Sequence, residues 1–373
     1  MLPKILSLSK SLISVPSVSS NKDKLKKVLE VGLEELKGVK GLTIEYFEKD
    51  GVSSALVYPG TTRPKKFKVI LNAHLDVVAA KDNQFKPYEE NGKLYGRGAI
   101  DMKAAAAVEI LVFKKIVETS HGVSLPIGLQ LVTDEEVGGF KGTLYQLEKG
   151  VRADFVVAGE PTDFGINNKA KGIIWLKIKT KGITGHGAYP WQGKNALVLA
   201  NKIVNNILKN YPTPKKETWQ TTFNLAKIET TNTTFNKIPD EAIISFDCRY
   251  IPEELKGLSF EKGKNLFLNK IKKIIDKEGE LEIILFEPPQ ITEEKNPFVL
   301  KLKKSVQKVT RKKSKTIVKH GGSDIRHFNR FGCDGVTFGP IGQGLHSDNE
   351  WVDIKSLEQY YFILEDFLKA FLS

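Results

Sequence analysis

Three stretches of the chain have the pattern of buried β-strands, and each of them ends in polar residues. They are KFKVILNAHLD at 66–76, LPIGLQLVTDEE at 125–136 and ADFVVAGEPTD at 153–163. The alanine-rich stretch DMKAAAAVEILVFKKIVE at 101–118 lies between the first two and predicts a long helix, and apolar residues also recur at helical spacing from Lys4 to Leu36. Strands that alternate with helices are typical of a parallel sheet covered by helices. We therefore predict an α/β fold with a mostly parallel sheet.

The middle of the chain has a different pattern. Apolar and polar residues alternate as they do in half-buried strands at 173–182, 221–231 and 240–251, with an amphipathic helix at 195–210. A chain of 373 residues is also longer than most domains that have a single hydrophobic core. We interpret residues 171–289 as an inserted α+β domain, and residues 1–170 and 290–373 as the two parts of a catalytic domain.

The composition limits the classes of protein to consider. Apolar residues make up 40% and charged residues 27%, as in ordinary globular proteins. The first twenty residues contain no apolar run long enough for a signal peptide or membrane span, so we expect a cytoplasmic protein without a membrane partner. Cys248 and Cys333 form no CxxC pair, which argues against a disulfide framework or a thiolate metal site. The net charge of +13 is spread over several helical stretches, so we expect no nucleic-acid partner.

Polar side chains follow the predicted strands, at the sheet edge where α/β folds bind ligands. They are His74, Asp76, Asp134, Glu135, Glu136, Glu160 and Asp163, joined by Asp101 at the start of the long helix and by His346 after GPIGQGLH. So many carboxylates would repel one another unless cations neutralised them, and imidazoles with carboxylates suit zinc, cobalt or manganese. Taken singly, a histidine after a strand is commonly structural, and paired glutamates commonly lie in a solvated loop. Their concentration at several strand ends favours a site with two metal ions.

Spacing suggests roles within this set. His74 and Asp76 are two residues apart and share a face of the strand, so Asp76 can accept the ring N–H that His74 does not use for metal. Glu135 and Glu136 are adjacent and point apart, so one can bind metal while the other acts as general base. Asp101 can lend one oxygen to each of two metals. The spacing leaves open which glutamate is the base.

Seven segments of the chain resemble a known set of motifs in their order. They are HLDVV, LYGRGAIDMKAA, TDEEVGG, GEPTD, KTKGITGHGAYP, GGSD and LHSDNEWV. This set is similar to that of the dinuclear zinc metallopeptidase family, which includes acetylornithine deacetylase, succinyl-diaminopimelate desuccinylase, aminoacylase and glutamate carboxypeptidase. The resemblance covers nearly the full chain. It implies a zinc-exopeptidase-like fold, two bound divalent metal ions and an inserted lid through which two subunits form a homodimer.

The resemblance also implies individual roles. One metal ion would be bound by His74, Asp101 and Glu160, and the other by Asp101, Glu136 and His346. Glu135 would be the general base, and His186 would enter the partner subunit's active site to stabilise the oxyanion.

Three further polar residues are expected to contact the substrate carboxylate. The family pattern indicates Asn236 in FNKIPDEA and Arg249 in FDCRY, and the segment GGSDIR offers Arg326 for the same anion. A surface ion pair is the alternative for both arginines. His320 and His327 flank the GGSD turn and are expected to support it, and we expect His121 to be a surface residue.

These residues predict hydrolysis of an amide bond in an N-acyl amino acid. The motifs are somewhat nearer to succinyl-diaminopimelate desuccinylase than to the other deacylases, with acetylornithine deacetylase next. This would place the enzyme in amino-acid biosynthesis. A dipeptidase or carboxypeptidase of the same family, acting on a dipeptide, is the first alternative, and a catalytically idle metal-binding relative is the second. A nucleotide site at GRGAID is disfavoured because the third glycine of the fingerprint is missing.

Overall fold

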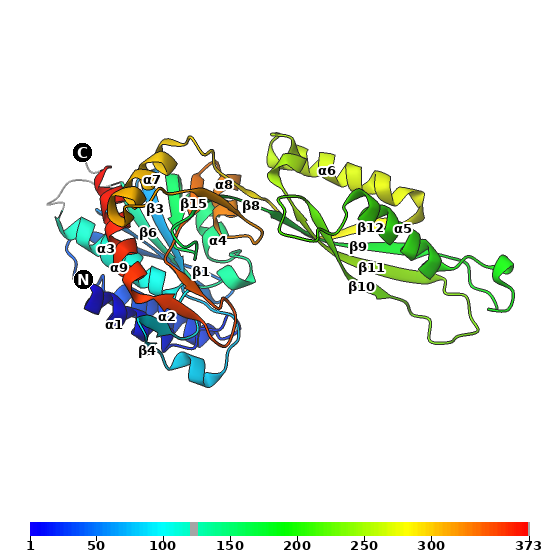
Figure 1. The fold of residues 1–373 in the computed structure, drawn as a ribbon, viewed down its shortest axis with the longest axis horizontal. Coiled ribbons are helices and arrows are strands. Elements are labelled where there is room, and N and C mark those ends of the chain that lie inside the picture. Colours follow the sequence, from blue (N-terminus) through cyan, green and yellow to red (C-terminus); the bar gives the residue numbers. More distant parts are fainter. Residues whose placement is uncertain (120–125, 372–373) are drawn as a thin grey trace. The chain divides into compact units, whose positions relative to one another are not determined.

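The computed structural model describes residues 1–119 and 126–371, which form two compact units (Figure 1). Unit 1 consists of Met1–Asn168, Ile291–Ile317 and Ser323–Ser373, and unit 2 consists of Lys169–Gln290 and Val318–Gly322. Unit 1 is therefore built from segments that flank unit 2 in the sequence. His121 lies outside the described residues.

A nine-stranded sheet forms the framework of unit 1. Its order is β1 (Leu42–Lys49), β2 (Val52–Pro59), β6 (Ile127–Val132), β3 (Phe67–His74), β7 (Ala153–Ala158), β15 (Asp334–Thr337), β8 (Ile166–Ala170) and β13 (Gln290–Ile291), and β14 (Thr316–Lys319) pairs with β8. The four central strands β6, β3, β7 and β15 are parallel, which confirms the predicted sheet. β1 and β2 form an antiparallel hairpin, because Asp50 and Gly51 both adopt the positive φ that a tight type I′ turn requires.

Helices cover both faces of this sheet. α1 (Leu2–Ile13), α2 (Lys22–Glu34), α3 (Lys103–Thr119), α7 (Pro297–Thr310) and α9 (Ile354–Lys369) share one apolar core with Val69 and Leu71 of β3. α4 (Thr143–Glu148) and α8 (Ile325–Arg330) share the core of the other face with Ile70. Successive residues of a strand point to opposite faces, so a strand covered on both sides appears in the sequence as an unbroken apolar run.

The predicted helical segment from Lys4 to Leu36 consists of two helices. α1 ends at Ile13 and α2 begins at Lys22. Pro16 lies between them and has no backbone N–H with which to continue a helix. The side chain of Asn21 then caps α2 by accepting a hydrogen bond from the backbone N–H of Lys24 at 3.2 Å.

A second, smaller sheet joins two distant segments of the chain. Its order is β16 (Gly342–Gln343), β17 (Trp351–Asp353), β5 (Lys93–Tyr95) and β4 (Tyr88–Glu90), and the 3₁₀ helix η1 (Asp82–Phe85) precedes β4. β17 and β5 are antiparallel, with Trp351 opposite Tyr95. This pairing brings the segment before Asp101 next to the segment that contains His346.

Unit 2 contains a four-stranded antiparallel sheet with helices on one face. The strand order is β10 (Thr222–Glu229), β11 (Glu241–Tyr250), β9 (Gly172–Lys181) and β12 (Glu280–Glu287). α5 (Ala196–Asn210) and α6 (Phe260–Ile275) share an apolar core with alternate residues of these strands, among them Ile174, Leu176 and Ile178. The 3₁₀ helices η3 (Pro190–Gln192), η4 (Pro252–Leu255) and η5 (Asp276–Glu278) lie in the connections.

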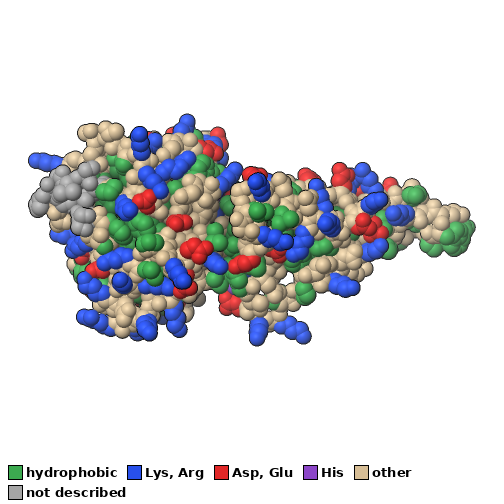
Figure 2. All heavy atoms as spheres, turned by 90° about the horizontal axis from the view of Figure 1, so that it is seen from above, with side chains coloured by type: hydrophobic (Ala, Val, Ile, Leu, Met, Phe, Trp, Pro, Cys, Tyr) green, Lys and Arg blue, Asp and Glu red, His purple; other side chains and the backbone are tan. Residues whose placement is uncertain are grey.

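Surface charge is distributed over both units. Lysine and arginine side chains are spread across the visible face of each unit rather than gathered in one area (Figure 2). Both cysteines, Cys248 and Cys333, are buried and free. Among the described residues, no helix has the length and apolar character that crossing a membrane would require.

Candidate active site

Adjacent parallel strands bring the predicted polar residues of unit 1 together. His74 is the last residue of β3, and Glu160 follows β7 by two residues. Glu135 and Glu136 form the 3₁₀ helix η2 (Glu135–Val137), which follows β6. Because β6, β3 and β7 are neighbours and run in the same direction, their carboxyl ends meet at one edge of the sheet.

The carboxylate of Asp101 lies between two histidine rings. Its Oδ1 is 3.1 Å from Nε2 of His74, and its Oδ2 is 3.1 Å from Nε2 of His346. The helix α3 begins at Lys103, so Asp101 precedes the helix by two residues and does not open it as the sequence suggested. In this position one carboxylate contacts both imidazole rings.

Two groups of possible metal ligands surround this carboxylate. His74, Glu135 and Glu160 form the first group, and Asp101, Glu136 and His346 form the second; within each, one donor atom per residue lies within 4.8 Å of the others. Nε2 of His74 is 3.7 Å from Glu160, and Nε2 of His346 is 3.3 Å from Glu136. The adjacent glutamates therefore face different groups. Asp101 also contacts the first group through His74, so it can serve both.

Electrostatics at this site reflects an excess of negative charge. Burial alone would lower the pKa of His74, but the carboxylates of Asp101, Asp76 and Glu160 raise it well above the usual value. The pKa of His346 is also raised, mainly by its hydrogen bond to Asp101. Conversely, burial would raise the pKa of Asp101, but the two histidines lower it.

The two glutamates of η2 are shifted in the opposite direction. Burial, followed by the negative charge of Glu160, raises the pKa of Glu135 well above its usual range. Burial is also the main reason that the pKa of Glu136 is raised to about 7, although both histidines oppose the shift. Carboxyl groups forced toward the neutral form in this way are stabilised as anions when a cation lies beside them.

This set of donors fits two divalent metal ions. It contains imidazole nitrogens and carboxylate oxygens without a thiolate, which suits zinc, cobalt or manganese. The carboxylate of Asp101 lies between the two histidines, where it could be shared by two ions. The electrostatics agrees, because two cations would relieve the repulsion among the carboxylates.

Asp76 supports both the histidine and the glutamate turn. Nδ1 of His74 lies 3.1 Å from the backbone carbonyl oxygen of Asp76 and 3.5 Å from its Oδ1, so the backbone oxygen is the nearer acceptor. The carboxylate of Asp76 accepts hydrogen bonds from the backbone N–H groups of Glu135 at 3.2 Å and Glu136 at 3.1 Å. Sequence spacing suggested contact with the ring but could not suggest the contact with η2.

Arg326 and His327 hold the loop that follows η2. Arg326 is buried and donates hydrogen bonds to the carbonyl oxygens of Ser323 and Gly138, each at 2.7 Å. Nε2 of His327 donates to the same Gly138 oxygen at 2.8 Å. The guanidinium predicted to bind a substrate carboxylate thus contacts backbone carbonyl groups in this structure.

The remaining predicted residues lie in unit 2. His186 and Asn236 are on neighbouring loops, where the backbone N–H of Gly187 donates to the carbonyl oxygen of Asn236 at 2.7 Å. Both are exposed. Arg249, on β11, forms two hydrogen bonds with Asp247, at 2.9 and 3.1 Å.

His320 also lies in unit 2, where its Nε2 is 3.1 Å from the carboxylate of Glu217. Glu217 lies outside the GGSD turn, which His320 was expected to support.

Sequence reasoning assigned no role to several buried charged residues beside this site. Arg97 and Glu350 form an ion pair of 2.6 Å, and Asp324 accepts a hydrogen bond from Thr143 at 2.5 Å. Three of these residues, Arg97, Asp324 and Glu350, belong to the motif segments quoted above. Their place in those motifs was the one feature of the sequence that could have indicated a role. Their partners are far away in sequence, so spacing alone could not reveal these contacts.

Comparison with known proteins identifies a family and several relatives of this chain. The model of Peptidase family M20/M25/M40 matches residues 70–370. An uncharacterized metallohydrolase from Methanocaldococcus jannaschii is 29% identical over 344 residues, which cover 82% of this chain and 81% of that protein. A succinyl-diaminopimelate desuccinylase from Rickettsia bellii is 27% identical over 346 residues, which cover 87% of this chain and 86% of that enzyme.

Solved structures share the fold. A tripeptidase from Staphylococcus aureus matches with a TM-score of 0.77 at 20% identity, covering 100% of this chain and 99% of that one. A dinuclear metal-binding peptidase of family M20 from Bacillus subtilis matches with a TM-score of 0.69 at 14% identity, covering 100% and 98%. The predicted fold class is thereby confirmed. Because the family model spans most of the chain, the resemblance indicated by the seven motifs is confirmed as well: the chain belongs to Peptidase family M20/M25/M40 and is a hydrolase of that family.

Proposed function

We propose that this protein hydrolyses the amide bond of an N-acyl amino acid at a dinuclear metal centre. The observation that carries the proposal is the carboxylate of Asp101, with one oxygen 3.1 Å from His74 and the other 3.1 Å from His346. Succinyl-diaminopimelate desuccinylases from Rickettsia bellii and Bordetella petrii are 27% and 26% identical to this chain. These relatives support an N-succinyl amino acid as the first substrate to test, followed by N-acetylornithine.

The metal ligands in this proposal are the side chains of the two groups other than Glu135, with Asp101 shared. We assign His74, Asp101 and Glu160 to one ion and Asp101, Glu136 and His346 to the other. Zinc is the first candidate, with cobalt or manganese as alternatives, because the donors are nitrogen and oxygen. When bound, such ions polarise the scissile carbonyl group and lower the pKa of water.

Glu135 is the proposed general base. It lies beside His74 and Glu160, and burial raises its pKa, which makes its carboxylate a better proton acceptor. It would take a proton from the attacking water and pass it to the leaving amine. The bond between the acyl carbon and the nitrogen then breaks, and the products are a carboxylate and a free amino group.

Unit 2 supplies the other proposed functions. We assign residues 171–289 to a lid that also joins two subunits. His186 would stabilise the oxyanion in the partner subunit's site, and Asn236 and Arg249 would bind the substrate carboxylate. For Arg249 this requires exchange of its present partner Asp247. A guanidinium carries five N–H donors, so Arg326 of unit 1 would contact the same carboxylate with donors other than the two that it gives to Ser323 and Gly138.

Exposed apolar side chains and an open sheet edge support the proposed homodimer. The side chain of Phe235 is fully exposed, and that of Trp191 is 74% exposed. β10 is an edge strand whose residues from Asn224 to Glu229 are all exposed. Edge strands and apolar groups on a surface are typical of sites where another chain binds. The buried free thiols of Cys248 and Cys333 fit a reducing compartment, so we place the enzyme in the cytosol.

A substrate panel tests the proposal. Metal-free protein is supplied with zinc or cobalt and then given N-succinyl-diaminopimelate, N-acetylornithine, N-acetylmethionine or a series of dipeptides. We expect amine release from one N-acyl amino acid, loss of activity with a chelator, and a fall in kcat of at least ~100-fold in Glu135→Ala. The exchange Glu148→Gln, at an exposed glutamate of the same unit, is the control.

The panel also decides between the candidate functions. Dipeptides present the same amide and carboxylate, so cleavage of these alone would identify a peptidase instead. Two bound metal ions without turnover of any substrate would indicate an idle relative. A protein that binds no metal would contradict the proposal altogether.

A further inference from the structure

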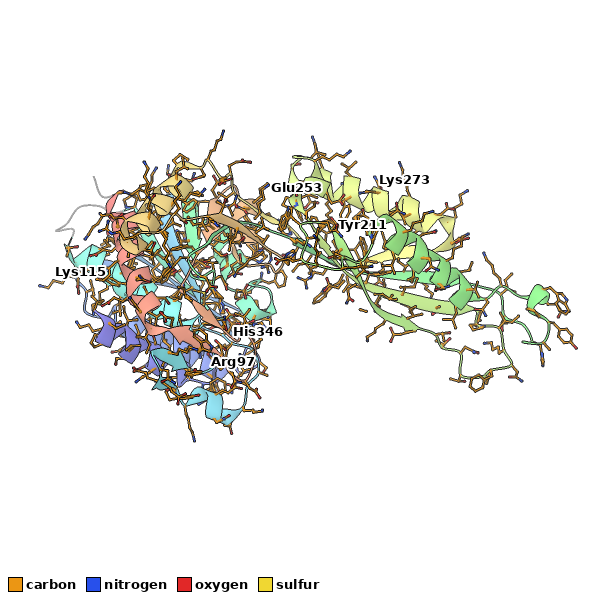
Figure 3. All side chains as sticks on the ribbon, viewed as in Figure 1. Arg97, Lys115, Tyr211, Glu253, Lys273 and His346 are labelled. Atoms are coloured by element: carbon orange, nitrogen blue, oxygen red, sulfur yellow. The ribbon has the colours of Figure 1, made fainter. Side chains whose placement is uncertain are left out.

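A buried ion pair lies next to the second group of metal ligands. Nη1 of Arg97 is 2.6 Å from Oε2 of Glu350, and both residues are only 2% exposed. Arg97 follows β5 and Glu350 precedes β17, so the pairing of these two strands brings Arg97 and Glu350 together. Figure 3 shows Arg97 close to His346 in unit 1.

Glu350 holds the backbone on which Asp101 stands. Its Oε1 accepts hydrogen bonds from the backbone N–H groups of Ile100 at 3.0 Å and Asp101 at 3.2 Å. Asp101 is the residue whose carboxylate lies between the two histidines. A shift of Glu350 would therefore move the carboxylate that both groups share.

Arg97 holds the loop on which His346 stands. Its Nη2 donates a hydrogen bond to the carbonyl oxygen of Ser347 at 3.1 Å, one residue after His346. The backbone N–H of Gly96 also donates to the carbonyl oxygen of Glu350 at 3.1 Å. One guanidinium thus joins the His346 loop to the carboxylate that fixes Asp101. The planar fork of arginine suits this double contact, which a lysine could not make.

We propose that Arg97 and Glu350 are positioning residues that set the distance between Asp101 and His346 and so tune the second metal group. This rests on the proposed metal centre. Removing two charges from water is costly, and such a pair persists when further hydrogen bonds satisfy it. Here those hydrogen bonds reach the backbone at a shared ligand, Asp101, and next to a ligand of the second group, His346. Metal sites tolerate little error in ligand position, and supporting contacts are what limit that error.

The first group has a different support. His74 contacts the backbone oxygen of Asp76, and the carboxylate of Asp76 holds the N–H of Glu135 as well as that of Glu136 in the second group. None of these contacts involves Arg97 or Glu350. Damage to the ion pair should therefore weaken the second group more than the first.

Metal titration of two variants tests this difference. In Arg97→Lys the positive charge remains, but the planar guanidinium that makes two contacts is lost. In Glu350→Gln the side-chain oxygen can still accept hydrogen bonds from the backbone, whereas the NH2 group of the amide faces the guanidinium of Arg97. Because Asp101 serves both ions, we expect the tighter equivalent of zinc to lose a little affinity in both variants. The weaker equivalent should lose at least ~10-fold in affinity, measured by competition with a chromophoric chelator. Excess zinc should restore most of kcat, because every ligand is still present.

Two matched variants complete the experiment. Asp348→Asn breaks an exposed ion pair with Lys81 on the same loop as His346, so both equivalents should bind as in the wild type. His346→Ala removes one ligand of the second group. Adding Arg97→Lys to it should lower the affinity of the remaining equivalent only a little.

The outcomes separate this proposal from the metal centre itself. If the wild type binds fewer than two equivalents, the centre is wrong. If the wild type binds two and the variants bind both normally, or lose both equally, the positioning role is wrong. Loss of the folded state in both variants, seen by circular dichroism, would also overturn it, since the pair would then support the whole fold.

Discussion

His327 is held in its neutral form by its surroundings. The side chain is fully buried, and Nε2 donates a hydrogen bond to the carbonyl oxygen of Gly138 at 2.8 Å. Burial, together with the positive charges of Arg326 and Arg330, lowers the pKa of His327 to about 3. In an unfolded chain the same ring would titrate near its ordinary value of about 6.5. Between these two values the unfolded state binds more protons than the folded state.

This difference predicts a specific dependence of stability on pH. The folded protein should lose stability as the pH falls from about 6.5 toward 3, by at most ~1.4 kcal/mol per pH unit from this residue. In His327→Gln this contribution is absent, while the amide can still donate to Gly138. Between pH 7 and pH 5 the free energy of unfolding of the wild type should therefore fall by up to ~2 kcal/mol more than that of the variant.

Urea unfolding of both proteins at the two pH values provides the measurement, because other titrating groups affect both equally. Parallel losses of stability in the wild type and His327→Gln would show that His327 is not neutral in the folded state.

At the scale of elements, η2 and the two glycines after it form a turn that presents the glutamates. The carbonyl oxygen of Asp134 accepts the N–H of Gly139 at 2.8 Å, and its Oδ2 accepts the N–H of Lys141 at 2.7 Å. Gly139 has a φ of +66°, and a Cβ there would lie 2.0 Å from Oδ1 of Asp324. Both the conformation and the close approach therefore require glycine.

Gly139→Ala should destabilise the protein by more than the cost of placing a side chain at a positive φ. Gly38 provides the control, since it also has a positive φ, +81°, but a Cβ there would meet nothing within 4 Å. Gly38→Ala should cost ~1–2 kcal/mol of stability, the usual penalty for a side chain in this conformation. Gly139→Ala should cost at least ~1 kcal/mol more and should also weaken metal binding, because η2 carries Glu135 and Glu136.

Urea unfolding and zinc titration of both variants give these values. Equal losses of stability in the two, with unchanged metal binding in both, would show that the contact with Asp324 does not control the turn.

At the scale of the whole molecule, each unit has a core of its own. The sheet of unit 1 is buried between helices on both faces, whereas unit 2 has helices on one face. Trp175 on β9 is 47% exposed, and the alternate residues Lys177 and Lys179 are exposed or half-buried beside it. The apolar side chains at Phe235 and Trp191 are therefore exposed features of a unit that already has a complete core.

The chain has a mass of 41.7 kDa, and the proposed dimer predicts a particle of twice that mass. Sedimentation equilibrium should detect it in the wild type, and Phe235→Ser should shift it toward the monomer, because burial of an aromatic side chain is lost. Leu258→Ser, at another exposed apolar residue of unit 2, is the control and should leave the mass unchanged. A wild type that sediments as a monomer would contradict the dimer, and equal effects of the two substitutions would contradict the role of Phe235.

Much of unit 1 could be predicted from local patterns. The apolar run that ends at His74 predicts a buried strand, and the alanine-rich stretch after Asp101 predicts a long helix. Local patterns failed where a single residue interrupts a regular repeat, as Pro16 does between α1 and α2. The neighbouring order of β6, β3 and β7 was also beyond a reading of the sequence, because it depends on how strands pair across the whole sheet.

The sequence by itself determined which metal-binding and acid–base groups this protein contains. It specifies imidazoles and carboxylates after strands, without thiolates, and it specifies motifs that identify the family. Only the tertiary structure decided how these groups meet: that Glu135 and Glu136 face different ligand groups, and that Arg97 contacts Glu350 across 253 positions. The physical reason is that a strand or a helix depends largely on neighbouring residues, whereas such contacts depend on the packing of the complete chain.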